Sequence, residues 1–70
     1  MDIVNQAKKY RKLHRLTQEA LAQAVGVSRR TIISLEKGKY TPSLLLALQL
    51  ADFFQVNISE IFYLDKQMGI

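Results

Sequence analysis

Helix start and stop signals recur so closely in these 70 residues that only short helices fit between them. Thr17 and Ser28 are residue types whose side chains cap the start of a helix. Gly26 and Gly38 are suited to ending one, because glycine adopts the left-handed conformation at little steric cost. Sustained alternation of polar and apolar residues, which is typical of strands, is missing before residue 60. The spacing predicts an all-α fold.

The same signals set the expected boundaries. Thr41-Pro42 predicts a helix start, with threonine as the cap and proline at the first helical position, and Asn57 with Glu60 has the spacing of a capping box. Only the tail alternates enough to form one short strand. We expect a single domain over residues 1–70, a compact five-helix bundle with helices at about 3–13, 18–25, 29–37, 42–54 and from 58 onward, and a short strand within the tail 63–70.

Composition excludes several classes of function. The chain has no cysteine and one histidine, His14, so we expect no disulfide, no metal site and no cofactor. It has no acidic pair at catalytic spacing and no phosphate-cradling glycine loop, so we expect no enzyme and no small-molecule ligand. The longest apolar run, residues 44–48, is far shorter than the roughly 20 residues of a membrane span, and no secretion signal opens the chain. The expected location is the cytoplasm, away from membranes.

Charge is distributed unevenly along the chain. Residues 1–40 carry nine Lys and Arg against three Asp and Glu, a net charge of +6, whereas residues 41–70 carry one against three, a net charge of −2. The basic part is suited to a polyanion, and a solvated surface with chance clustering is the alternative.

The segment 28–37 has two different helical faces. Ser28, Ile32 and Leu35 form an ordinary core-facing stripe. The opposite face breaks two local rules, because Arg29 and Arg30 oppose the helix dipole in the first turn and the bulky Ile33 points outward between cations. Such violations tend to mark function. The face has the chemistry to read a DNA major groove, where arginine bonds guanine and isoleucine touches a thymine methyl group.

The tight connection between the second and third expected helices is typical of a helix-turn-helix unit, at about residues 17–37. From Ala7 to Phe62 the chain resembles the Cro/phage-repressor, or Xre-like, helix-turn-helix regulators of the small stand-alone form. The segments that carry the resemblance are Thr17-Gln18-Glu19-Ala20-Leu21-Ala22, Gly26-Val27-Ser28-Arg29-Arg30-Thr31-Ile32, Glu36-Lys37-Gly38-Lys39-Tyr40 and Pro42-Ser43.

The resemblance implies roles for individual residues. It implies that Gln18 bonds a phosphate and braces the first residue of the recognition helix, and that Arg11 and Glu36 form a partly buried ion pair. The residues implied to read bases are Arg29, Arg30, Ile33 and Ser34; those implied to contact the DNA backbone are Thr17, Gln18, Ser28, Thr31, Lys37, Lys39 and Tyr40. The chain departs from the family at Arg15 and Gln55, where glycine is frequent, so strain is expected in both loops.

The fourth expected helix is apolar nearly all round, and such a helix requires burial on both sides. We expect one stripe, Leu44, Ala47, Leu48, Ala51 and Phe54, to face the core. We expect the other side to form a homodimer interface made of Leu46, Leu50, Phe53, Tyr63 and Leu64. Coverage of that side by the fifth helix and the tail is the alternative.

These observations together predict a homodimeric, sequence-specific regulator that binds double-stranded DNA at an inverted repeat, with recognition helices about 34 Å apart. We expect a repressor; an activator is the alternative, and it would need a patch for touching a polymerase, which is not identifiable in the sequence. The alternative is an antitoxin-like or adaptor module whose apolar C-terminal half holds a partner protein.

Overall fold

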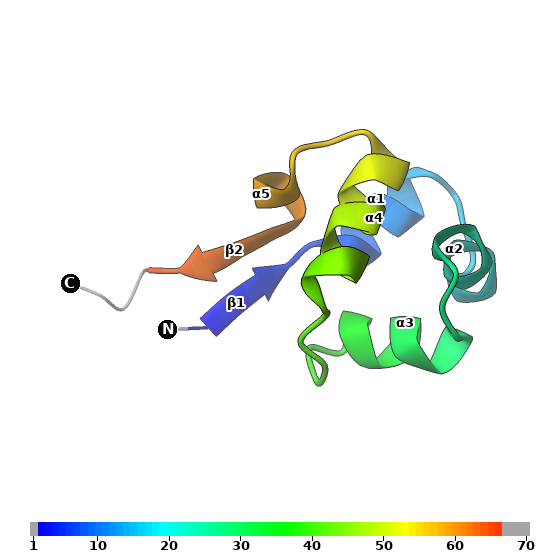
Figure 1. Ribbon diagram of the computed structural model, residues 1–70, viewed down its shortest axis with the longest axis horizontal. Helices are drawn as coiled ribbons and strands as arrows, with labels where there is room; N and C mark the ends of the chain where they lie inside the picture. Colours follow the sequence, from blue (N-terminus) through cyan, green and yellow to red (C-terminus); the bar gives the residue numbers. More distant parts are fainter. Residues whose placement is uncertain (1, 67–70) are drawn as a thin grey trace.

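The computed structural model describes residues 2–66 as a group of helices from which a two-stranded ribbon projects (Figure 1). The elements, in chain order, are β1 (Asp2–Asn5), α1 (Ala7–Leu13), α2 (Gln18–Val25), α3 (Arg29–Glu36), α4 (Leu44–Phe54), α5 (Ile58–Ile61) and β2 (Phe62–Asp65). The ribbon lengthens the molecule to 40 Å along its longest axis, against 23 and 21 Å along the others.

The ribbon corrects the prediction of an all-α fold and of a first helix from residue 3. β1 pairs antiparallel with β2, with Ile3 opposite Leu64 and Val4 opposite Tyr63. The β-branched Ile3 and Val4 favour an extended backbone once a partner strand is present. That partner lies some sixty positions away in the chain, beyond the reach of a local pattern. The expected tail strand occurs at Phe62–Asp65, and residues 67–70 of that expectation lie outside the described part.

Helix α1 begins at Ala7 because two hydrogen bonds turn the chain there. The Asn5 side-chain oxygen Oδ1 accepts from the Ala7 amide at 2.9 Å, and the Gln6 amide donates to the Ile61 carbonyl at 2.8 Å. The first bond satisfies an amide at the helix start that has no partner within the helix. The second joins this start to the end of α5.

The helix-turn-helix connection follows the predicted signals. Thr17 Oγ1 accepts from the Ala20 amide at 3.0 Å at the start of α2, and Gly26 ends that helix with φ of 76°. Ser28 Oγ then accepts from the Thr31 amide at 3.2 Å and starts α3. The predicted caps of both helices are confirmed.

Helix α4 begins two residues later than predicted, so the interpretation of Thr41-Pro42 as its start is wrong. Ser43 is the cap, and its Oγ accepts from the Leu46 amide at 3.1 Å. Thr41 and Ser43 are both residue types that cap helices and lie two positions apart in the sequence, and the structure shows that Ser43 is the cap. Thr41 and Pro42 belong to the loop after α3.

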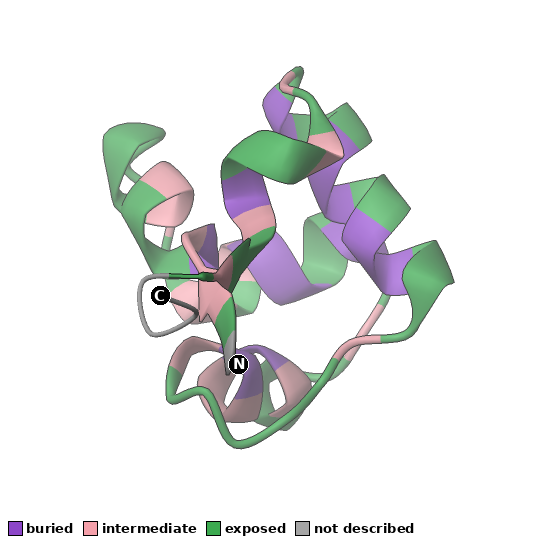
Figure 2. Cartoon of the chain, turned by 90° about the vertical axis from the view of Figure 1, so that its left-hand side faces the viewer, coloured by how far each residue is buried: buried purple, intermediate pink, exposed green. Residues whose placement is uncertain are grey.

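The core combines the inner faces of the five helices, and it corrects the expected orientation of α4. Leu46 and Leu50 are 3% and 0% exposed in the chain itself, so they cannot form a dimer interface. Of the stripe expected in the core, Ala47, Ala51 and Phe54 are buried as predicted, whereas Leu44 and Leu48 are exposed. Because α4 is apolar nearly all round, its pattern alone did not specify which side packs. Figure 2 shows the buried segments on the helices and only half-buried and exposed segments on the described part of the ribbon.

Two loops place non-glycine residues in the left-handed region. Arg15 between α1 and α2 has φ of 57°, and Gln55 after α4 has φ of 58°. These are the two positions at which the sequence departs from the family's frequent glycine. An L-residue in this conformation costs roughly 1–2 kcal/mol, so both loops carry backbone strain.

We predict that Arg15→Gly raises the free energy of unfolding by about 0.5–1 kcal/mol, because relief of the strain outweighs the extra entropy of glycine in the unfolded chain. Arg15→Ala is the control, since it removes the same charge and keeps the strained backbone. Urea unfolding of the three proteins measures the difference. Equal stability of the glycine and alanine variants would contradict the strain assignment.

Candidate nucleic-acid interface

Helix α3 presents an outward face that is polar at its N-terminal end. Arg29 and Arg30 are exposed in the first turn, and Ile33 and Ser34 are half-buried one turn further along. No acidic side chain lies in that first turn. The inner face of the same helix is anchored by Ile32 and Leu35, both fully buried. The helix is therefore fixed to the core along one side and carries its two arginines at the accessible end.

The hydroxyl groups beside these arginines are already engaged with one another. Ser28 Oγ and Thr31 Oγ1 lie 2.9 Å apart, and Ser28 also caps α3. Both residues keep partly accessible side chains, and their mutual hydrogen bond fixes where they point. Of the residues expected to contact the DNA backbone, these two lie at the start of α3, next to Arg29.

Glu36, the last residue of α3, is the point at which three helices meet. Its carboxylate forms a bidentate pair with Arg11: Oε2 accepts from Nε at 2.6 Å, and Oε1 accepts from Nη2 at 3.1 Å. The two side chains are 3% and 11% exposed, with Glu36 the more buried. Arg11 also donates to the Leu16 carbonyl at 2.7 Å, so α1, the following loop and α3 share one polar cluster.

Gln18 contacts the C-terminal end of α3, whereas contact with its N-terminal end was expected. Its Nε2 donates to Glu36 Oε1 at 3.2 Å, so it braces the last residue of the recognition helix. The expected contact with the first residue of that helix stays a prediction. The side chain is half-buried and lines the same hollow as Arg29.

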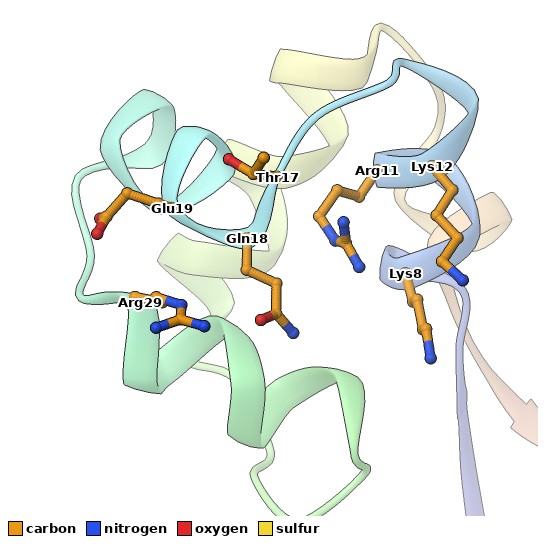
Figure 3. Close-up of a pocket in the computed structure, with 7 residues that line it drawn as sticks. All are labelled: Lys8, Arg11, Lys12, Thr17, Gln18, Glu19 and Arg29. Carbon is orange, nitrogen blue, oxygen red and sulfur yellow. The ribbon is translucent and has the colours of Figure 1, made fainter.

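A basic hollow of about 660 Å³ opens between α1, the start of α2 and the start of α3 (Figure 3). In this view the Gln18 amide lies between Arg29 on one side and the cationic side chains of α1 on the other. The Glu19 carboxylate points away from the group. The residues that line the hollow are Lys8, Arg11, Lys12, Thr17, Gln18, Glu19 and Arg29. Its charge and the amides at the start of α2 suit an anion.

Lys8 and Lys12 are the two lysines of this hollow, and the sequence interpretation assigned neither of them to the interface. They lie four residues apart on α1 and flank Arg11, so they share one helical face with it. Arg11 was already expected to meet α3. That expectation could have identified the two lysines, because a cation on the same face of the first helix as Arg11 is also directed toward the recognition helix.

The loop after α3 places a second group of basic residues at the other end of the recognition helix. Lys37 ends the helix, Gly38 follows with φ of 73°, and Lys39 and Tyr40 are exposed. The structure therefore separates the residues expected to contact the DNA backbone into two clusters, one at each end of α3.

The residues expected to form a dimer interface do not form one surface. Phe53 lines a hollow with Gln23 and Gly26 of the α2 end, whereas Tyr63 and Leu64 lie on the ribbon. On the ribbon they border a small apolar depression of about 210 Å³ together with Ile3 and Phe62. Ile3, Tyr63 and Leu64 are 50%, 43% and 49% exposed. Ile3 and Leu64 lie opposite each other across the strands and share one face, and we name these two side chains the ribbon patch; Tyr63 points to the opposite face.

Within residues 2–66 no helix is long and apolar enough to cross a membrane. The same residues contain no group of three or more His, Cys, Asp or Glu side chains placed to hold a metal ion.

Comparison with known proteins gives matches over most of the chain. A family model described as helix-turn-helix matches residues 8–61. An HTH-type transcriptional regulator of Methanocaldococcus jannaschii is 62% identical over 58 residues, which cover 83% of this chain and 88% of that protein. A Bacillus subtilis protein described in the same terms is 40% identical over 63 residues, 90% of this chain and 96% of the relative.

A solved structure is similar in fold as well as in sequence. The restriction-modification controller protein C.AhdI from Aeromonas hydrophila matches with a TM-score of 0.73 and 29% identity, covering 79% of this chain and 83% of that one.

We predict that Arg11→Met lowers the free energy of unfolding by about 3 kcal/mol, because it leaves the buried Glu36 carboxylate without its charged partner. The double variant Arg11→Met/Glu36→Leu is expected to recover most of this loss, since an apolar pair leaves no buried charge unpaired. Urea unfolding of the single and double variants tests both statements. A double variant as unstable as Arg11→Met would show that the loss comes from packing and not from the unpaired charge.

Proposed function

The chain belongs to the helix-turn-helix family of DNA-binding transcriptional regulators, and we propose that it represses transcription as a homodimer bound to an inverted-repeat operator. The observation that carries this proposal is the outward face of α3, with two exposed arginines at its start and its inner side buried in the core. An α-helix presented in this way fits the major groove, where arginine donates two bonds to guanine.

In this proposal Arg29, Arg30, Ile33 and Ser34 read base edges. The two arginines supply the hydrogen bonds, and the half-buried Ile33 supplies an apolar contact to a thymine methyl group or a sugar. Base contacts give sequence preference, whereas contacts to the phosphates hold the protein in register.

The basic hollow takes a DNA phosphate at the start of the recognition helix. Lys8 and Lys12 approach it from α1, and Gln18 approaches it from the start of α2. Thr17, Ser28 and Thr31 border the same region, and Lys37, Lys39 and Tyr40 hold the backbone beyond the other end of α3. Because each neutralised phosphate releases counterions, affinity should fall steeply with salt, with a slope of about −0.9 per phosphate contact.

The homodimer is proposed to form through the ribbon patch, which replaces the interface expected from the sequence. A two-stranded sheet is at best marginally stable alone, and here Ile3 and Leu64, which lie opposite each other across the two strands, expose apolar side chains on one face of it, whereas Tyr63 points to the other face. A second copy seated on the patch would bury those apolar side chains and place the two recognition helices on a two-fold axis. Occupancy of an operator by such a dimer excludes other proteins from the same duplex, which is the simplest route to repression.

A second candidate function is a module that holds a partner protein. The observation in its favour is a group of three leucines on the outer side of α4, Leu44, Leu45 and Leu48, which are 70%, 67% and 49% exposed. Light scattering on the purified chain separates the two candidates. A discrete dimer that binds DNA supports the regulator, and a monomer that binds no DNA supports the partner-binding module.

We predict that Arg29→Ala and Arg30→Ala each weaken binding to the preferred operator by about 1–3 kcal/mol and change binding to random DNA little, because they remove base contacts. Lys39→Ala is the matched control, since it removes one exposed cation proposed to contact the DNA backbone. It should weaken binding to the preferred operator and to random DNA by similar factors. The operator is first obtained by selection from a random pool, and titrations by fluorescence anisotropy then measure each variant. Loss of specific and random binding in equal measure by both arginine variants would refute the assignment of base readers.

We also predict that Leu64→Gln shifts the chain toward monomer and raises the concentration needed for half-saturation of the operator at least tenfold, because it places an amide in the ribbon patch. Leu13→Gln is the control, since Leu13 is a 66% exposed leucine on α1, away from the ribbon. Light scattering and operator titration of both variants give the result. A Leu64→Gln protein that remains dimeric would place the dimer interface elsewhere.

A further inference from the structure

Asn5 lies at the junction of the ribbon and the helices. It is the last residue of β1, where it pairs with Phe62 of β2. Two residues later α1 begins, and the Asn5 side-chain oxygen accepts the Ala7 amide at 2.9 Å. The side chain is half-buried, so its orientation is defined by what it touches.

The nitrogen of the same side chain reaches the recognition helix. Asn5 Nδ2 donates to the Leu35 carbonyl at 2.7 Å, across thirty positions of sequence. Leu35 lies in the last turn of α3, where carbonyl groups have no partner within the helix. The Gly38 amide donates to the same carbonyl at 3.0 Å, so the two bonds fill its two acceptor positions.

This contact and the Glu36 cluster hold neighbouring residues of α3 from two different directions. Glu36 is bonded to Arg11 and Gln18, which belong to α1 and α2. Leu35 is bonded to Asn5, which belongs to the ribbon. The C-terminal turn of α3 is therefore tied both to the helix-turn-helix unit and to the element that carries the ribbon patch.

We infer that Asn5 is a positioning residue that sets the angle of the recognition helix relative to the ribbon, and thereby the spacing of half-sites that the dimer accepts. The inference rests on the proposed function, since only in a ribbon-mediated dimer does the orientation of α3 relative to the ribbon fix the separation of two recognition helices. One base pair added between half-sites rotates them by about 35°, because a helical turn of DNA holds about 10–10.5 base pairs. A rigid link between ribbon and α3 makes the protein sensitive to that rotation.

The test compares Asn5→Asp with the natural chain on the selected operator and on versions with one base pair more or fewer between the half-sites. Aspartate keeps an oxygen for the Ala7 amide and cannot donate to the Leu35 carbonyl, so it removes one bond of the two. We expect an unchanged dimer and about tenfold weaker binding to the best operator. We also expect the drop in affinity from the best operator to the altered spacings to be smaller for Asn5→Asp than for the natural chain. The bond is absent from the free and the bound variant alike, so the tenfold estimate takes the loss of a fixed helix orientation to cost about as much binding free energy as one partly buried hydrogen bond.

Gln55→Glu is the matched control. Gln55 Nε2 donates to the Asp52 carbonyl at the end of α4, at 2.6 Å, so this variant also replaces an amide by a carboxylate beside a helix C-terminus. It lies outside the ribbon and should keep the natural spacing profile. Should Asn5→Asp fail to fold, Asn5→Ser is measured in the same way.

Three results would overturn the inference. An Asn5→Asp protein with natural affinity and spacing profile would show that the bond is dispensable, and equal loss at every spacing would reduce Asn5 to a structural role. Altered spacing in Gln55→Glu as well would remove the link to the ribbon. A natural chain that is monomeric at every concentration would contradict the proposed function directly, and this inference would fall with it; the natural chain alone decides that point.

Discussion

The buried carboxylate of Glu36 is the interaction on which the rest of the structure depends. It sits at the end of α3 with almost no exposure, and nitrogen donors from α1 and α2 converge on it. A charge in such a place is tolerated only when its partners are held in good geometry, so the position of one carboxylate constrains three helices at once. A packing that separated Glu36 from Arg11 would leave an uncompensated buried charge and is disfavoured for that reason.

That constraint explains the asymmetry of the recognition helix. Its C-terminal turn is bonded through Glu36 and through the Leu35 carbonyl, whereas its N-terminal turn contributes Arg29 and Arg30 to the accessible surface. A surface that recognises DNA requires a backbone held in place and side chains that remain accessible. In this eight-residue helix the C-terminal turn meets the first requirement and the N-terminal turn meets the second. The basic hollow lies at the free end, bordered by the lysines of α1.

Local chemistry made the helix-turn-helix unit predictable from sequence. Thr17 and Ser28 cap the helices that follow them, and Gly26 ends α2 in a left-handed turn. Each of these signals acts within a few residues, and the structure confirms all three. What could not be predicted depends on contacts between distant segments. β1 exists because a strand sixty residues later pairs with it, and the buried side of α4 was ambiguous because both sides are apolar. In the site, the convergence of Gln18 on Glu36 required knowing how α2 packs against α3.

Several local choices in the chain lower its stability as an isolated molecule. Arg15 and Gln55 hold left-handed backbone conformations, and Arg29 and Arg30 oppose the dipole of α3 by about 0.3–1 kcal/mol each. The arginine cost is electrostatic, so the negative field of a duplex would remove it, and exposed apolar area on the ribbon would be removed by a second copy. Both partners would bind the folded chain and not the unfolded one, and each would therefore raise its apparent stability by an amount that grows with the logarithm of the ratio of its concentration to its dissociation constant. Arg29, Arg30 and the exposed ribbon side chains therefore weaken the free chain at the places through which DNA and a second subunit are proposed to be recognised, whereas the strain at Arg15 and Gln55 is confined to their loops.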